Sequence, residues 1–235
     1  MIKLAIAIST YAVKKENESR LQKCVDSLMR SGFSGRIIVV DDGSEMQREV
    51  GGVLLGRIKI HHRDTNGGVS KCKNTCIRLI EEQGYDIGFL ADDDLLFEKS
   101  WWVPYVAAIK TTKLGHFSWA NHKKGTAAFK INEHLIYKTM QLNGCLMTFT
   151  PKVIETVGGF PTHPDSKWGW DHVPWTNRIN RKFFPSLSRG EGLDVATSNE
   201  LIKLQDAPSA VTIADRRKNR DMKFLEEKVY LPLEE

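Results

Sequence analysis

The chain has 235 residues, of which 41% are hydrophobic and 27% charged, as in an ordinary globular protein of one large α/β domain or two small ones. It contains no run of about 18 apolar residues that would cross a membrane, and the apolar segment 2–8 lacks a following signal-peptide cleavage site. We therefore expect a cytoplasmic protein, and the net charge of +5 suits anionic ligands such as nucleotides without establishing them.

The first hundred residues alternate between apolar strands and amphipathic helices. Residues 3–8 form an apolar run that predicts a buried strand, and the apolar spacing over 16–30 predicts a helix. Further strands are expected at 36–40, 58–61 and 87–91, and further helices at 50–55 and 70–82. Because strands that alternate with helices pair in parallel with right-handed crossovers, the fold class is α/β with a mostly parallel sheet.

The second half of the chain is less regular. We expect a helix at 101–110, a strand at 116–120, a polar hairpin or loop at 122–132, a strand at 142–150, and helices at 151–157 and 172–183. A strand at 193–196 and a helix at 215–228 follow. No internal repeat and no linker interrupts the pattern, so a single domain is favoured.

The cysteines lack the spacing of a zinc site. Cys72 and Cys76 lie one helical turn apart, which indicates a buried thiol face, and Cys24 and Cys145 stand alone.

Polar residues follow three of the predicted strands at their carboxyl ends. They are residues 9–11, 41–44 and 92–94. Ligands of open α/β sheets bind outside the carboxyl ends of the strands, so these three segments are expected to converge on one rim.

The triplet Asp92, Asp93 and Asp94 is costly at the end of a buried strand unless a cation or an array of donors answers it. Carboxylate oxygens suit Mg²⁺ or Mn²⁺, which predicts a metal and phosphate site. The alternative is a solvated acidic turn in which Asp93 or Asp94 caps the next helix.

Over about residues 3–183, the chain resembles the inverting family 2 glycosyltransferases of the GT-A fold. The resemblance rests on the order and spacing of Ile8-Ser9-Thr10-Tyr11, Val39-Val40-Asp41-Asp42-Gly43-Ser44, Asn66-Gly67-Gly68 with Asn74, and the aspartate triplet. Later segments resemble the acceptor side of galactosyltransferases: Gly158-Gly159-Phe160-Pro161, Trp168-Gly169-Trp170-Asp171-His172 and Asn177-Arg178. The resemblance implies a core over residues 1–184, with a nucleotide-sugar half to about residue 98 and an acceptor half after it, and a C-terminal extension over 185–235 packed on the core.

By this resemblance, the nucleotide base and ribose of a sugar donor would be held by Ser9, Thr10, Tyr11, Asp41 and Asp42. The same aspartates fit an ordinary strand-to-helix turn.

Gly67 would let the chain approach the diphosphate near a helix N-terminus, although a plain turn before that helix also fits. Lys71 and Lys73 lie where family members often place a basic residue near the donor, and two solvent-facing lysines are an equal alternative.

The aspartate triplet corresponds to the Asp-x-Asp metal motif of the family. Asp94 would be the most direct ligand of Mn²⁺ or Mg²⁺, and Asp92 or Asp93 would reach the ribose or, through water, the metal. Many family members carry an aspartate where Ala91 stands, so which two carboxylates act is left open.

Inverting transfer needs one general base near the acceptor hydroxyl. By the resemblance, the usual Glu-Asp pair, whose second residue is the base, is replaced here by Asp171-His172. Asp171 is the first choice, because a carboxylate is ionised at neutral pH without a special pKa, and His172 is the rival at the usual position of the base. Asp171 also fits the N-cap of the following helix, and Trp168 and Trp170 fit either a sugar-stacking platform or buried anchors.

The implied function is a metal-dependent inverting glycosyltransferase of the hexosyltransferase type, with UDP as the favoured nucleotide. Its acceptor would be the hydroxyl of a glycan, a glycoconjugate or a modified DNA base, and the sequence indicates no protein partner. The alternatives are a nucleotidyltransferase that makes a nucleotide-sugar, and a noncatalytic carbohydrate- or nucleic-acid-binding protein of the same fold. The first is disfavoured because residues 9–13 lack glycine, and the second because Asp92, Asp94 and Asp171 are intact.

Overall fold

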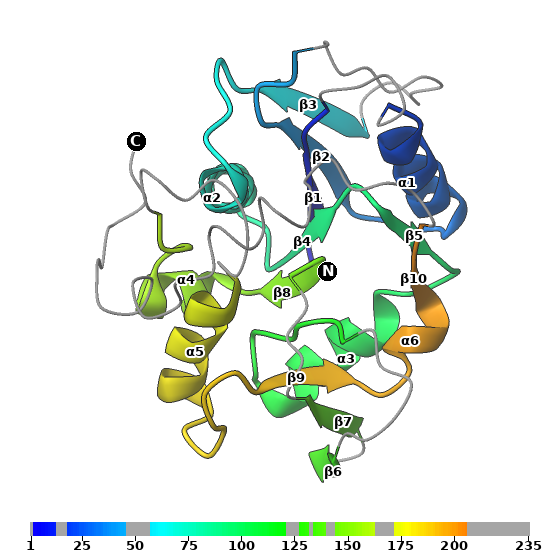
Figure 1. Ribbon diagram of the computed structural model, residues 1–235. Helices are drawn as coiled ribbons and strands as arrows, with labels where there is room; N and C mark the ends of the chain where they lie inside the picture. The colour runs from blue at the N-terminus through cyan, green and yellow to red at the C-terminus, as the bar shows by residue number, and fades with distance from the viewer. Residues whose placement is uncertain are drawn as a thin grey trace.

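The structure is a computed structural model that describes residues 2–12, 18–45, 57–120, 127–131, 134–139, 144–162 and 172–205 (Figure 1). The predicted helices at 50–55 and 215–228 lie outside these residues. So do Asp171 and the two tryptophans that precede it.

A five-stranded sheet forms the centre of the fold, in the order β3-β2-β1-β4-β8. Its strands are β1 (Leu4–Thr10), β2 (Arg36–Asp41), β3 (Ile58–His62), β4 (Ile87–Asp92) and β8 (Leu146–Phe149). The first four pair in parallel, as the alternation of strands and helices predicts, and β8 is antiparallel to β4. The mostly parallel α/β sheet expected from the sequence is confirmed.

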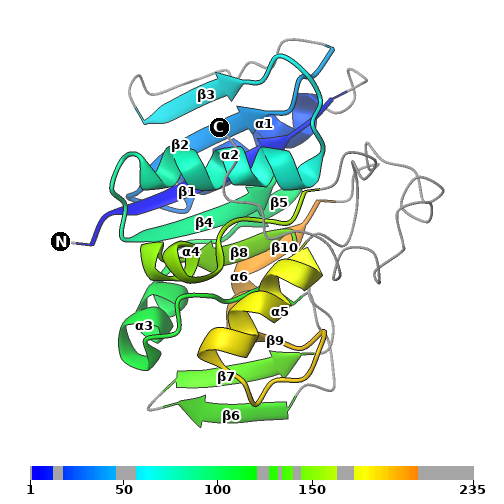
Figure 2. The same ribbon diagram turned by 90° about the vertical axis from the view of Figure 1, so that its left-hand side faces the viewer.

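The two faces of this sheet are covered by different helices (Figure 1). On one face, Ile6 and Ile8 of β1 pack with α1 (Glu18–Arg30) and α3 (Val103–Thr112). On the other, Ala5 and Ala7 pack with α2 (Val69–Glu81), which lies in front of the sheet in Figure 2, and with α4 (Pro151–Val157) and α5 (His172–Phe183). Both faces are therefore buried, which explains why the strands read as continuous apolar runs.

The described residues form two smaller sheets as well. Strand β5 (Leu95–Phe97) pairs with β10 (Ile202–Leu204), and β7 (His134–Thr139) lies between β6 (Ala127–Ile131) and β9 (Gly192–Val195). The short helix α6 (Ser198–Leu201) precedes β10. Residues beyond 184 thus supply strands to both of these sheets.

The strand expected at 116–120 is not found, because this segment contributes only one bridge, between Ser118 and Met147. The hairpin expected at 122–132 is present in part: β6 lies within these bounds, and β7, its antiparallel partner, lies beyond them. Neither β5 nor β7 was expected as a strand. The pairing partners of β5 and β7 include strands far along the chain, which local patterns do not reveal.

An aromatic cluster holds the turn between β4 and β5. Trp101 is fully buried, with its ring centroid 4.9 Å from that of Phe89 in β4 and 4.5 Å from that of Phe97 in β5. Phe33 stacks on the same indole at 5.6 Å. Because both strands that flank the aspartate triplet pack on one indole ring, this packing holds the turn between them in place.

Candidate active site

The carboxyl ends of β1, β2 and β4 meet at one rim of the central sheet. Parallel pairing places Thr10 beside Asp41 and Ser9 beside Asp92. The Ser9 hydroxyl lies 3.2 Å from Asp92 Oδ1 and donates a hydrogen bond to it. The three polar segments predicted to converge do so.

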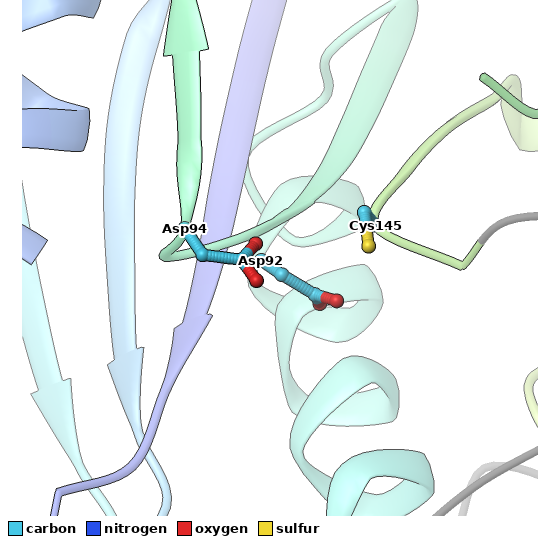
Figure 3. A group of neighbouring side chains, drawn as sticks. All are labelled: Asp92, Asp94 and Cys145. Atoms are coloured by element: carbon cyan, nitrogen blue, oxygen red, sulfur yellow. The ribbon is translucent and has the colours of Figure 1, made fainter. Parts of the chain in front are cut away.

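Asp92 and Asp94 form one group with Cys145, whose backbone precedes β8 (Figure 3). One carboxylate oxygen from each aspartate and the Cys145 sulfur all lie within 4.8 Å of one another. Asp94 Oδ1 is buried and makes no hydrogen bond among the described residues. A buried oxygen without a donor, beside a second carboxylate, fits a divalent cation.

The charge at this group is unfavourable without a cation. Burial, together with the carboxylates of Asp92 and Asp93, raises the pKa of Asp94 to about 7. Burial and the charge of Asp92 also raise the pKa of the Cys145 thiol. Both shifts follow from crowded negative charge at low solvent exposure.

The middle aspartate of the triplet points elsewhere. Asp93 accepts a hydrogen bond of 2.5 Å from the Thr10 hydroxyl and pairs with Arg20, whose Nε lies 3.0 Å from Oδ1. Both side chains of this ion pair are 7% exposed. The triplet is also followed by strand β5, so the alternative in which it caps a helix is wrong.

Asp92 has a buried cation beside it. Lys73 Nζ lies 2.9 Å from Asp92 Oδ1 and donates to the carbonyl of Gly144. Burial alone would lower the pKa of Lys73, but the Asp92 carboxylate more than offsets this and the pKa is raised. Lys71, in contrast, is exposed, so of the two lysines only Lys73 lies against the aspartates.

Asp42 holds the glycine loop that precedes α2. Its carboxylate accepts hydrogen bonds from the N–H of Gly67 at 3.1 Å and Gly68 at 2.9 Å, and from the Arg63 guanidinium. Burial raises the pKa of Asp42 to about 6, against the opposing effect of Arg63 and the two amides. The amide of Gly67 is therefore bonded to Asp42 in this structure, and the approach of a diphosphate to residue 67 stays a prediction.

Space also explains the glycine at position 67. A Cβ there would lie 2.5 Å from a guanidinium nitrogen of Arg63. Asp41 has a separate role, because it accepts from the Ser44 N–H at 3.3 Å and lies 3.1 Å from His62 Nδ1. Both aspartates after β2 thus organise the loops of this rim.

The candidate base His172 is the first residue of α5. A Cβ on Gly144 would lie 2.7 Å from His172 Nδ1, so this imidazole packs against the segment that also accepts from Lys73. His172 is therefore next to the residue that precedes Cys145. Asp171, the other candidate base, lies outside the described residues.

Helices α2 and α5 both bind the loop at 158–160. Asn74 exchanges two hydrogen bonds with the backbone of Phe160, at 2.7 and 3.0 Å, and the Arg178 guanidinium donates to Gly159 O. Trp175 Nε1 donates to Gly158 O at 2.9 Å. These contacts hold the loop at 158–160 against both α2 and α5.

Sequence reasoning missed three residues that contact the expected site: Cys145, Arg20 and Arg63. Cys145 had no recognisable motif around it, and neither arginine lies within ten residues of its aspartate. The predicted helix over 70–82, however, already placed Lys73 on the same face as Cys76 and Ile77, which are buried.

Known proteins resemble this chain in sequence and in structure. The glycosyl transferase family 2 model matches residues 6–182. An uncharacterized glycosyltransferase, R363 of Acanthamoeba polyphaga mimivirus, is 33% identical over 221 residues, which cover 86% of this chain and 81% of the viral protein.

Two solved structures share the fold. GalNAc-T7 with UDP, GalNAc and Mn²⁺ has a TM-score of 0.60 at 12% identity over 76% of this chain. S. aureus TarS (residues 1–349) in complex with UDP has a TM-score of 0.52 at 16% identity over 76% of this chain. The chain spans only 40% and 55% of the lengths of these two proteins.

The fold and its aspartate-bearing rim define a GT-A glycosyltransferase. The chain belongs to glycosyl transferase family 2, and it is a glycosyltransferase. Among the described residues, no helix combines the length and the apolar character needed to span a membrane.

Proposed function

We propose that the protein is a metal-dependent inverting hexosyltransferase that moves a sugar from a UDP-sugar donor to a hydroxyl acceptor. The observation that carries this proposal is the pair Asp92 and Asp94 at the carboxyl end of β4, where Oδ1 of Asp94 is buried without a hydrogen-bond partner among the described residues. Similar structures that contain UDP, and in one case Mn²⁺, support the choice of nucleotide and ion.

Asp94 and Asp92 would hold Mn²⁺ or Mg²⁺. When bound, the ion neutralises charge that develops on the departing nucleoside diphosphate. Ser9 and Lys73 both contact Asp92 Oδ1 and so orient this carboxylate, and burial of Lys73 keeps its charge at a fixed position. Asp93, tied to Arg20, keeps the turn rigid instead of contacting the donor.

On the donor side, Tyr11, Asp41 and Asp42 border the part of the rim that would receive the uridine. Asp42 acts by accepting hydrogen bonds from the amides of residues 67 and 68, and its carboxylate also accepts from the Arg63 guanidinium. Ser9 and Thr10 are already bonded to Asp92 and Asp93, so their hydroxyls position the aspartates.

On the acceptor side, Asp171 would remove the proton from the attacking hydroxyl, and His172 is the alternative base. The contact of His172 with Gly144 supports this placement, because Gly144 is one residue from Cys145 and bonds Lys73. Attack opposite the departing UDP would invert the anomeric carbon. The acceptor would be a glycan, a glycoconjugate or a modified DNA base.

The test compares thermal unfolding with UDP, with and without Mn²⁺, in the wild type and in Asp94→Asn. At a ligand concentration one hundred times the dissociation constant, wild type should gain about 2.7 kcal/mol of stability. Asp94→Asn should lose the Mn²⁺-dependent part, whereas Asp64→Asn, at an exposed position, should keep it. An equal Mn²⁺-dependent gain in wild type and Asp94→Asn would overturn the metal assignment.

Donor choice is tested on the same proteins. A panel of UDP-hexoses is incubated with Mn²⁺, and release of UDP is measured. We expect slow hydrolysis of one of these donors by wild type and none by Asp94→Asn.

A further inference from the structure

The cation group contains a sulfur atom as well as two carboxylates. Cys145 Sγ and one oxygen from each of Asp92 and Asp94 lie within 4.8 Å of one another, and Figure 3 shows the three side chains gathered at the end of β4. The other three thiols, Cys24, Cys72 and Cys76, are buried outside this group.

The backbone holds Cys145 in this position. The Asp92 N–H donates to the Cys145 carbonyl at 2.8 Å, one residue beyond the pairing of Ala91 with Leu146. The preceding carbonyl, that of Gly144, accepts from Lys73. Because sheet pairing and a buried lysine both fix this segment, the sulfur is held beside the aspartates by the fold itself.

A second observation at the same place points to a ligand. Asp94 Oδ1 is buried and has no hydrogen-bond partner among the described residues. An unsatisfied buried carboxylate oxygen is costly, and a cation bound by Asp94 would satisfy it.

Sulfur changes which cation the site prefers. Mg²⁺ is a hard ion that takes oxygen ligands, whereas thiolate ligands favour Zn²⁺ and other softer divalent ions. At sites with nitrogen, oxygen or sulfur ligands, the affinity also rises from Mn²⁺ through Co²⁺ to Cu²⁺. Zn²⁺ binds such sites more tightly than Mn²⁺ does. Carboxylates alone follow the same order, and a thiolate ligand adds to it a preference for the softer ions.

We propose that Cys145 supplies a third protein ligand to the divalent ion at Asp92 and Asp94, and that this sulfur makes the site select Co²⁺ or Zn²⁺ over Mg²⁺. The proposal rests on the metal dependence of the proposed function and goes further by naming a ligand and a preference. Coordination forms a metal–sulfur bond, and the thiol proton leaves to solvent.

The experiment is a titration of the metal-free protein with Co²⁺, followed by its absorption spectrum. A sulfur-to-cobalt charge-transfer band in the near ultraviolet reports the bond directly and needs no turnover. We expect this band in wild type and in Cys72→Ser, whose thiol lies in α2 outside the group. Cys145→Ser and Cys145→Ala should lack it.

Affinities provide a second measurement. Zn²⁺ affinity, measured by competition with a chelator, should fall by about 10–100-fold in Cys145→Ser. A loss of this size is seen even when only a group that hydrogen-bonds a metal ligand is removed. Mg²⁺ affinity should be unchanged by the same substitution. Circular dichroism of each variant checks that it is folded.

The result that would overturn the proposal is a wild-type protein that binds Co²⁺ without the band, or a band that persists in both Cys145 variants. UDP binding with Mn²⁺, measured on the same samples, separates this failure from failure of the proposed function. UDP binding without a cobalt–sulfur band leaves the proposed function intact and shows that Cys145 is not a metal ligand. A band without metal-dependent UDP binding keeps Cys145 as a ligand and removes the proposed function.

Discussion

Lys73 Nζ lies 2.9 Å from Asp92 Oδ1, so a buried ammonium from α2 is paired with the last residue of β4. The same nitrogen donates to Gly144 O, which connects the segment before β8 to the pair. Three elements that are distant in the chain are thereby held together at the rim by one side chain. The lysine side chain is 3% exposed and the aspartate side chain 33%, so the pair is only partly screened by water.

The two lysines of α2 give a matched comparison. Lys73→Met should lower the free energy of unfolding by about 1.5–3 kcal/mol, because it removes a charged hydrogen bond and leaves Gly144 O without its donor. Lys71→Met, at an exposed position, should stay within about 0.5 kcal/mol of wild type. Urea unfolding measures both, and equal effects would contradict the role given to Lys73.

The Arg20 and Asp93 pair is expected to be structural. Arg20→Met should cost about 3–5 kcal/mol of stability, because it leaves a buried carboxylate without its partner. The double variant Arg20→Met with Asp93→Asn should recover part of this loss. Arg30→Met, on the exposed end of the same helix, serves as the control. A double variant no more stable than Arg20→Met would count against this interpretation.

His116 should make the protein sensitive to mild acid. Its Nδ1 lies 2.8 Å from Thr148 O and therefore carries the proton, and Nε2 accepts from the Thr176 hydroxyl at 3.0 Å. Burial lowers the pKa of His116 from 6.5 to about 4. The pKa describes the second proton, which makes the imidazole cationic. Because the unfolded chain binds this second proton more tightly than the folded chain does, stability is lost as the pH falls from about 6.5 toward 4.

The size of this effect follows from the shift, and is about 3 kcal/mol at full extent. The difference in unfolding free energy between wild type and His116→Asn, measured at several pH values, isolates it from the aspartates. Nuclear magnetic resonance of the imidazole gives a direct check. Resonances of His116 that titrate near pH 6.5 would refute the expected protonation.

The two candidate bases can be distinguished by pH as well as by substitution. Asp171→Asn should preserve UDP binding and lower transfer by about 10²–10⁴-fold, whereas His172→Gln should retain most of the activity. A carboxylate base gives a rate that is flat above about pH 5, and an imidazole base gives a rate that falls below about pH 6.5. A large loss in His172→Gln with an acid limb near 6.5 would transfer the role to His172.

Local patterns in the sequence predicted much of the central sheet. The strands around Ile6, Ile38 and Phe89 are apolar runs of the length and position that the structure shows, and the helix over 69–81 follows from its periodicity. The convergence of Ser9, Asp41 and Asp92 also follows from the alternation of strands with helices, because parallel strands end at one rim.

Only the tertiary structure separated neighbouring residues of the same kind. Asp93 and Asp94 differ by one position, yet the turn before β5 directs Asp93 toward Arg20 and Asp94 toward Cys145. No local pattern encodes this choice, because it depends on a helix far back in the chain and on a strand fifty residues ahead.

What the sequence determined by itself was therefore the parallel strands of the central sheet and the edge at which their polar ends meet, since these depend on side-chain period and chain direction. What the tertiary structure decided was which charge meets which partner. A buried charge is stable only beside an opposite charge or a donor, and those partners, such as Lys73 for Asp92, come from elements that only folding brings together.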